Sequence, residues 1–197
     1  IKDFFLNYKS RVNDFTLSLN KSDEIIYHSN FHDDEWKISL IDTGLHSMTG
    51  CRISQIRDLV DGDFMLTYGD AVSDIDLIKL KEFHQGHNKS LTVTGVRPPG
   101  RFGELQVNGE MVEAFNEKPQ ASSGRVSGGF FMAKTKIFEY LNDDINLVFE
   151  QDPISKIVND KELMMFKHDG FWQPMDTSRD HRLLNEMYLN KNINWKL

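Results

Sequence analysis

The chain of 197 residues is long enough to bury a hydrophobic core, and its 39% hydrophobic and 27% charged content is ordinary for a globular protein. The net charge of −7 argues against a nucleic-acid partner, because phosphate contacts need clustered Lys and Arg. The single cysteine, Cys51, excludes an internal disulfide, and no membrane-spanning run or signal peptide is visible. We therefore expect a cytoplasmic protein with no membrane partner.

The first part of the chain combines a helix with short strands. Apolar residues at helical spacing predict a helix over 1–11, which starts at Ile1 with no capping residue before it. For this reason we expect a chain that is truncated at its N-terminus. Alternation of polar and apolar residues then predicts three strands, at 14–19, 23–28 and 36–41.

The middle of the chain is organised around FMLTYGD, residues 64–70. Its apolar run predicts a strand that is buried on both faces of a sheet. A helix over 51–60, capped by Thr49 or Gly50, precedes this strand. A helix over 74–87 and a β-rich run over 90–96 follow it, and this order predicts a βαβ unit with parallel strands.

The second half is rich in short β runs. Asn108-Gly109 is a strong hairpin signal between two of them. The runs lie at 102–107, 111–115, 128–133 and 163–167, and the helices at 135–141, 152–160 and 178–190. The whole chain, 1–197, therefore reads as one α/β domain with a hairpin-rich second half.

Asp70 and Asp176 are the leading candidates for a metal site. Asp70 follows a strand, and ligands bind at the carboxyl ends of strands in open α/β sheets. Asp176 follows an aromatic turn, and two carboxylates suit Mg²⁺ when phosphates and waters supply the other ligands. The alternative for each is a helix cap, a role that Asp fills well.

Other stretches could contact a ligand, and each has a plain alternative. The Gly- and Thr-rich loop 42–50 offers backbone N–H groups, or is an ordinary polar loop. Arg101, between two glycines, could meet a phosphate, or be solvated. Glu117 and Lys118 suit a sugar hydroxyl and a phosphate, or form a surface ion pair. Gly128-Gly129 permits close approach of a ligand, or marks a β-bulge.

Six blocks carry a resemblance that runs through essentially the whole chain. Taken in this order, they resemble the sugar-phosphate nucleotidylyltransferases, and the last block is similar to the cytidylyl branch of that family. The blocks are DTGLHSMTGCR (42–52), LTYGDAVSD (66–74), PPGRFGEL (98–105), FNEKP (115–119), SGGFF (127–131) and GFWQPMDTSRD (170–180).

The resemblance implies a fold, a reaction and a set of roles. The fold would be a three-layer α/β/α sandwich with a mostly parallel, mixed sheet. The reaction would transfer a cytidylyl group from CTP to glucose 1-phosphate, giving CDP-glucose and pyrophosphate. Asp70, Lys118 and Asp176 would be catalytic, and the two aspartates would bind Mg²⁺. Glu117 would meet the sugar hydroxyls and Lys118 the sugar phosphate. The sugar pocket would be lined by Gly103, Gly128 and Gly129, and the nucleotide bordered by Thr43, Gly44, Thr49, Gly50 and Arg52.

Departures from the family pattern define the alternatives. No GxGTR-like run, the family's triphosphate cradle, occurs in these residues. Cys51 and Ala71 stand where the family usually shows glycine, and Ser127 where it shows asparagine. We therefore expect that this chain does not turn over although its full-length parent does.

The alternatives come from other classes of protein. One is a catalytically silent subunit that binds sugar phosphate or serves regulation or assembly. Another is a nucleotide-sugar glycosyltransferase, although a DxD pair is needed at the strand end and Asp70 is a single acid there. Homo-oligomerisation through Trp195 stays open, and docking of this Trp within its own chain is equally consistent with the sequence.

Overall fold

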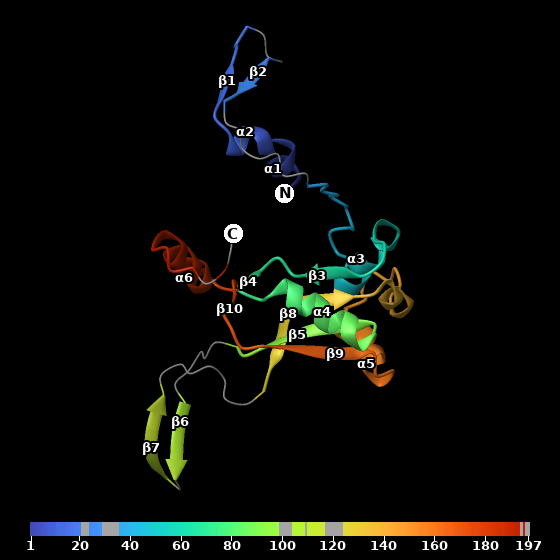
Figure 1. Cartoon of the computed structure of the whole chain (residues 1–197), viewed down its shortest axis with the longest axis vertical. Coiled ribbons are helices and arrows are strands. Elements are labelled where there is room, and N and C mark those ends of the chain that lie inside the picture. The colour runs from blue at the N-terminus through green and yellow to red at the C-terminus, as the bar shows by residue number, and fades with distance from the viewer. Residues whose placement is uncertain are drawn as a thin grey trace. The chain divides into compact units, whose positions relative to one another are not determined.

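The computed structural model (Figure 1) describes residues 1–20, 24–28, 36–98, 104–108, 110–116, 124–193 and 195. By internal packing the chain divides into two compact units, Ile1–Asp42 and Thr43–Leu197. Each unit is described by itself, and the expectation of one domain over 1–197 stays a prediction. No helix among the described residues has the length and apolar character that a membrane span requires.

The N-terminal unit holds two short helices and a hairpin. The helices are α1 (Lys2–Leu6) and α2 (Tyr8–Val12), where one helix over 1–11 is predicted. They separate at Asn7, whose side chain donates to the Asp3 backbone oxygen at 2.9 Å and so competes with helical hydrogen bonding. β1 (Phe15–Leu17) pairs antiparallel with β2 (Ile25–Tyr27), as the alternation predicts.

The strand predicted over 36–41 is wrong, because these residues form neither helix nor strand. Trp36, Ile38 and Leu40 do alternate with polar neighbours. A strand, however, needs a neighbour to satisfy its backbone hydrogen bonds, and no described segment pairs with this one. The alternation is therefore present without the sheet that it anticipates.

A four-stranded mixed sheet organises the larger unit. Its order is β3 (Phe64–Thr67), β8 (Val126–Ala133), β5 (Leu91–Val96) and β9 (Leu163–His168). β8 runs antiparallel to both neighbours, whereas β5 and β9 are parallel. The predicted parallel relation of β3 and β5 is thus confirmed, although β8 lies between them.

Helices cover both faces of this sheet, which confirms the α/β/α layers. On one face, α4 (Leu77–His87) packs across β8, β5 and β9 (Figure 1). On the other face lies the hydrophobic core, to which three further helices contribute. These are α3 (Thr49–Ser54), the 3₁₀ helix η2 (Thr135–Tyr140) and α5 (Asp152–Asn159). Leu91, Phe131 and Phe149 are the centre of that core.

β3 is an edge strand, so the expectation that it is buried on both faces is wrong. Phe64 and Leu66 are half-buried and pack against the core. Met65, on the opposite face, is 47% exposed. An apolar run of four residues cannot distinguish a central strand from an edge strand, because periodicity says nothing about neighbours.

Short elements complete the unit. β4 (Ala71–Ser73) pairs antiparallel with β10 (Trp172–Pro174), and neither strand is predicted from the sequence. β6 (Glu104–Asn108) and β7 (Met111–Asn116) form the predicted hairpin. The 3₁₀ turn η1 (Arg57–Leu59) follows α3, and α6 (Ser178–Leu189) closes the chain. Trp195 stacks on Phe171 with ring centroids 5.5 Å apart, so this Trp docks within its own chain.

A polar network lies between α4 and β5. The Lys89 N–H donates to His87 Nδ1 at 3.0 Å, which leaves the His87 proton on Nε2, 2.8 Å from Thr92 Oγ1. The Thr92 hydroxyl is then able to donate its hydrogen to His84 Nδ1, which lies 2.8 Å from Thr92 Oγ1. His84 is fully buried, and its Nε2 has no hydrogen-bond partner in the described part of the chain. Burial lowers the pKa of both His84 and His87, so the network favours neutral rings.

Candidate active site

The carboxyl edge of the sheet gathers residues from distant parts of the sequence. β3, β5 and β9 run in one direction, so their carboxyl ends share an edge with the amino end of β8. Tyr68–Asp70 follow β3, Arg97 follows β5, and Asp169 follows β9. Gly128 and Gly129 lie near the start of β8. This is the edge at which open α/β sheets bind their ligands.

The pairing of β4 with β10 brings the two candidate carboxylates to one place. Pro174 lies opposite Ala71, and the Met175 N–H donates to the Asp70 carbonyl oxygen at 2.7 Å. Asp70 and Asp176 therefore flank the same end of one antiparallel ladder. Both residues are exposed, so a ligand can reach their side chains.

Neither aspartate is a helix cap, so the alternative role named for both is wrong. The N-cap of α4 is Asp76, which accepts from the N–H groups of Ile78 and Lys79 at 3.1 and 3.0 Å. Both bonds lower the pKa of Asp76 below its usual value, and the bond from the Lys79 N–H has the larger effect. The N-cap of α6 is Thr177, in a capping box with Asp180.

The donor set at this ladder end fits Mg²⁺. Two carboxylates are the number that a magnesium ion takes from a protein when phosphates and waters complete its shell. No group of three or more His, Cys, Asp or Glu that could enclose a metal ion occurs in the described ranges. The magnesium site therefore stays a prediction.

The loop before α3 is held by its own side chains. Arg52 donates to Thr43 Oγ1 at 2.7 Å and to the Leu45 carbonyl at 3.2 Å. Gly44 has a φ of +88°, which favours glycine. Arg52 therefore holds the loop that is predicted to border the nucleotide.

The start of α3 is packed against the segment that precedes α5. The N-cap of α3 is Met48, so the predicted cap at Thr49 or Gly50 is wrong. The Gly50 N–H donates to the Leu147 carbonyl at 2.8 Å, and a Cβ on Gly50 would lie 2.9 Å from that oxygen. Glycine is required at position 50 because the two backbones approach each other closely. The predicted contact of Thr49 and Gly50 with a nucleotide stays a prediction.

Gly128 and Gly129 lie beneath two aromatic rings. The β5–β8 register shifts between Val93 and Gly95, so the glycine pair coincides with a β-bulge. Trp172 Nε1 donates to the Gly128 carbonyl at 2.9 Å. Gly129 has a φ of +77°, and its N–H donates to Ser127 Oγ at 3.3 Å. The serine that replaces the family's asparagine therefore has an internal partner.

Two arginines fix the far side of the same edge. Arg125 donates to the carbonyls of Gly95 and His168 at 2.9 and 2.8 Å, and so joins the ends of β5 and β9. Asp169 accepts from Arg97 at 3.0 Å and from Arg125 at 2.6 Å. These two bonds hold the pKa of Asp169 below its usual value.

Three predicted residues, Gly103, Glu117 and Lys118, lie outside the described residues, as does Arg101. Their roles stay predictions. Cys51 is fully buried, and its Sγ accepts from Gln55 Nε2 at 3.1 Å. The sequence did not single out Glu150, whose carboxylate contacts both Thr49 and Tyr68.

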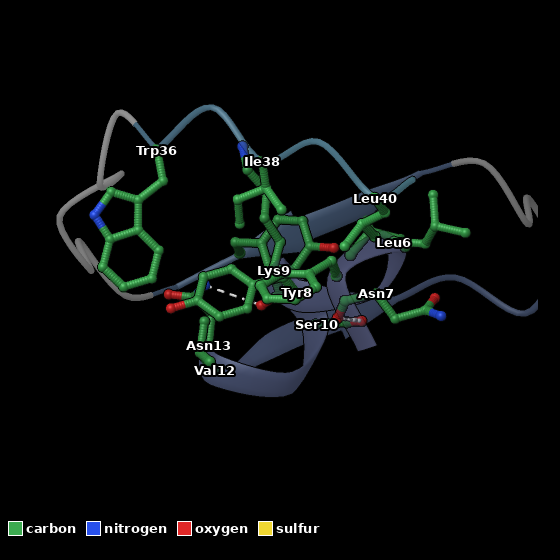
Figure 2. Close-up of a pocket in the computed structure, with 13 residues that line it drawn as sticks. Leu6, Asn7, Tyr8, Lys9, Ser10, Val12, Asn13, Trp36, Ile38 and Leu40 are labelled. Carbon is green, nitrogen blue, oxygen red and sulfur yellow. Dashed lines mark hydrogen bonds between the residues drawn. The ribbon is translucent and has the colours of Figure 1, made fainter. Parts of the chain in front are cut away.

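A cavity of about 700 Å³ lies within the N-terminal unit (Figure 2). Its lining includes Tyr8 and Leu6 from the helices and Trp36, Ile38 and Leu40 from the unpaired segment. None of the described residues that line it is a predicted site residue. The cavity is mostly apolar and has no cluster of acidic or basic groups to bind a nucleotide.

Comparison with known proteins defines the class of protein. The chain belongs to the nucleotidyl transferase family, whose profile matches residues 6–184. It is 36% identical, over all of its length and 76% of the relative, to glucose-1-phosphate cytidylyltransferase of Salmonella typhimurium. It is 35% identical, with the same coverage, to a Bacillus subtilis protein assigned the same activity.

A solved structure shares the fold. It comes from Bacillus anthracis, was assigned as a glucose-1-phosphate thymidylyltransferase and contains sucrose. The TM-score is 0.56 at 17% identity, over 77% of this chain and 64% of that one. At this identity the likeness supports the α/β architecture alone.

Proposed function

We propose that the protein transfers a cytidylyl group from CTP to glucose 1-phosphate, giving CDP-glucose and pyrophosphate. The proposal is supported by the 36% identity to the Salmonella typhimurium cytidylyltransferase across the whole chain. The structural observation that carries it is the Met175–Asp70 hydrogen bond of 2.7 Å, which brings the segments of both candidate carboxylates together.

The proposed chemistry is an in-line displacement at the α-phosphorus of CTP. A phosphate oxygen of glucose 1-phosphate forms the new P–O bond, and pyrophosphate leaves with the electrons of the old one. Mg²⁺, when bound, supplies neutralisation of the triphosphate charge. Asp70 and Asp176 would hold it, Glu117 would orient the sugar and Lys118 would meet its phosphate.

We expect Gly128 and Gly129 to contribute to the site by permitting close approach of neighbouring groups to the backbone. Gly128 and Gly129 carry no side chain above the start of β8, and Trp172 and Tyr68 hold the backbone there. Together with Gly103 they would line the sugar pocket. The loop that Arg52 holds would border the nucleotide.

Binding is the first test, because it measures the nucleotide preference that the cytidylyl assignment predicts. Titration calorimetry with CTP, UTP, GTP and glucose 1-phosphate, each with Mg²⁺, measures the selectivity directly. We expect CTP to bind most tightly. Equal, weak binding of CTP and UTP would contradict the cytidylyl assignment.

The Asp70→Asn variant tests the metal site. It keeps the backbone carbonyl that Met175 uses, so the fold should persist while Mg²⁺-dependent CTP binding weakens by at least about tenfold. Asp61→Asn, at an exposed position before β3, is the matched control and should bind like the wild type. Unchanged magnesium dependence in Asp70→Asn would remove this carboxylate from the site.

The silent-subunit alternative draws on Ser127, whose hydroxyl already accepts the Gly129 N–H. It predicts binding of glucose 1-phosphate with no binding of CTP. The same calorimetric series separates the two functions, because each nucleotide and the sugar phosphate are titrated independently.

A further inference from the structure

Glu150 joins two of the six sequence blocks although it belongs to neither. It lies between the core residue Phe149 and α5, and it is exposed. Its Oε2 accepts from Thr49 Oγ1 at 2.8 Å, and its Oε1 accepts from the Tyr68 hydroxyl. One carboxylate therefore ties the start of α3 to the residue that follows β3.

Both hydroxyl donors have fixed positions. Thr49 Oγ1 also accepts the Phe149 N–H at 2.9 Å, which leaves its own hydrogen for Glu150. The Tyr68 ring lies edge-on to the Phe131 ring, with the ring centroids 5.9 Å apart. The Tyr68 backbone N–H donates to the Gly129 carbonyl at 3.2 Å. A Cβ on Gly129 would lie 2.8 Å from the Tyr68 ring. The carboxylate thus bridges two groups that are already oriented.

The Tyr68–Asp70 turn connects this bridge to the candidate metal ligand. A Cβ on Gly69 would meet nothing within 4 Å, so packing does not hold the middle of the turn. Its ends are held by Glu150 on Tyr68 and by the Met175 N–H on the Asp70 carbonyl. Loss of Glu150 would remove the side-chain anchor of Tyr68 and leave only its backbone bond and ring contact at that end of a segment that glycine makes flexible.

Glu150 does not itself complete a metal site. The described part of the chain has no set of three or more His, Cys, Asp or Glu that could hold an ion, so Glu150 is not a third ligand beside Asp70 and Asp176. Its two partners are neutral hydroxyls, which orient a carboxylate without neutralising it. Its place in the site is therefore that of a support.

We propose that Glu150 is a positioning residue, which fixes the Tyr68–Asp70 turn against the start of α3. The spacing between the Asp70 carboxylate and the nucleotide border then depends on it. The inference rests on the function proposed above. Groups that orient a metal-binding side chain typically change metal affinity by about 10- to 100-fold when they are removed.

The test uses Glu150→Gln, Tyr68→Phe and the double variant in the full 197-residue chain. The two hydroxyls donate to different oxygens of Glu150, so a glutamine would place its NH₂ group, which cannot accept, against one of them. Each single variant should raise the Mg²⁺ concentration for half-maximal CTP binding by about tenfold, and the double variant by no more than either. Hydrogen exchange of the amides in 68–70 should quicken in all three. Glu82→Gln, on the exposed surface of α4, is the charge-matched control and should change neither measurement.

The two measurements separate this proposal from the proposed function. Wild-type exchange and magnesium dependence in Glu150→Gln would overturn the positioning role. So would additive effects in the double variant, or a lowered melting temperature with unchanged magnesium dependence. If the wild type binds no CTP, the proposed function has failed and the exchange data decide: faster exchange at 68–70 supports the positioning role, and unchanged exchange overturns it.

Discussion

Similar apolar patterns occur in both compact units, but the described apolar side chains are buried in a core only in Thr43–Leu197. In Thr43–Leu197, Leu91, Phe149 and Ile157 are each 0% exposed. In Ile1–Asp42, Leu6 and Leu19 are 84% and 93% exposed, and no described residue is buried. Helix and strand periodicity is present in both units. A periodic apolar face becomes a core only where a second layer covers it, as the sheet and its helices do in the larger unit.

The difference bears on function as well as on stability. Every predicted site residue lies in Thr43–Leu197, and Thr43, Gly50 and Asp70 are held by hydrogen bonds within that unit. The described lining of the apolar cavity in the N-terminal unit includes none of them. The contrast therefore predicts that substitutions in the larger unit change stability and ligand binding together.

The sharpest test is a matched pair of leucines. Leu91→Ala removes a side chain from the centre of the core and should cost about 3–5 kcal/mol of unfolding free energy. Leu19→Ala acts on an exposed side chain and should cost less than about 0.5 kcal/mol. Urea unfolding followed by circular dichroism measures both. Equal losses would mean that the N-terminal unit has a core of its own, and the comparison would fail.

Two glycines repeat the contrast within the larger unit. Gly129 and Gly62 both have positive φ, at +77° and +72°. A Cβ on Gly129 would lie 2.8 Å from the Tyr68 ring, whereas one on Gly62 would meet nothing within 4 Å. Alanine at either position should cost about 1–2 kcal/mol for the left-handed backbone. Gly129→Ala should lose about 1–3 kcal/mol more by displacing Tyr68. Equal unfolding free energies for the two variants would show that the ring yields freely.

A pH dependence should follow from the buried histidines. Burial lowers the pKa of His84 and His87, so below about 6.5 the unfolded chain binds more protons than the folded chain. Stability should therefore fall as the pH drops through that value. Lys134 lowers both pKa values further, whereas Asp63 opposes the shift at His84 and Glu162 opposes it at His87.

Urea midpoints between pH 8 and 5.5 measure this slope. Replacing both rings, in His84→Gln with His87→Gln, should flatten the slope whatever the double variant does to stability at pH 8. An identical slope in wild type and double variant would assign the acid sensitivity to other groups.

Much of the larger unit could be predicted from local sequence. The runs over 90–96 and 163–167 became β5 and β9 within one residue at each end, and 152–160 became α5. These segments found partners, so their periodicity was sufficient. The β4–β10 pair was missed because three-residue strands have no measurable period and their pairing joins distant segments.

The candidate site also combines features that local sequence predicts with features that only the fold reveals. Asp70 and Asp176 could be singled out from the sequence as metal ligands or helix caps, but only the N-caps found at Asp76 and Thr177 exclude the second role. Glu150 had no local signal, since its partners lie 101 and 82 positions away. Gly128-Gly129 is predicted to permit close approach of a ligand or to mark a bulge; the structure confirms the bulge, and the approach of a ligand stays a prediction.

The smallest expected effect concerns the ion pair of the N-terminal unit. Arg11 meets Asp3 at 2.9 Å, with side chains 49% and 79% exposed, and lies over the Phe4 ring at 5.7 Å. Solvent screens such a pair, so Asp3→Asn should cost less than about 0.5 kcal/mol. The loss should vanish in about 1 M NaCl, where the Debye length falls to about 3 Å. Circular dichroism of a peptide covering residues 1–42, at low and high salt, measures it against the wild-type sequence. A loss well above 1 kcal/mol that persists in salt would mean that this pair lies in a low-dielectric environment, and the N-terminal unit would then be more like the larger unit than its exposed leucines indicate.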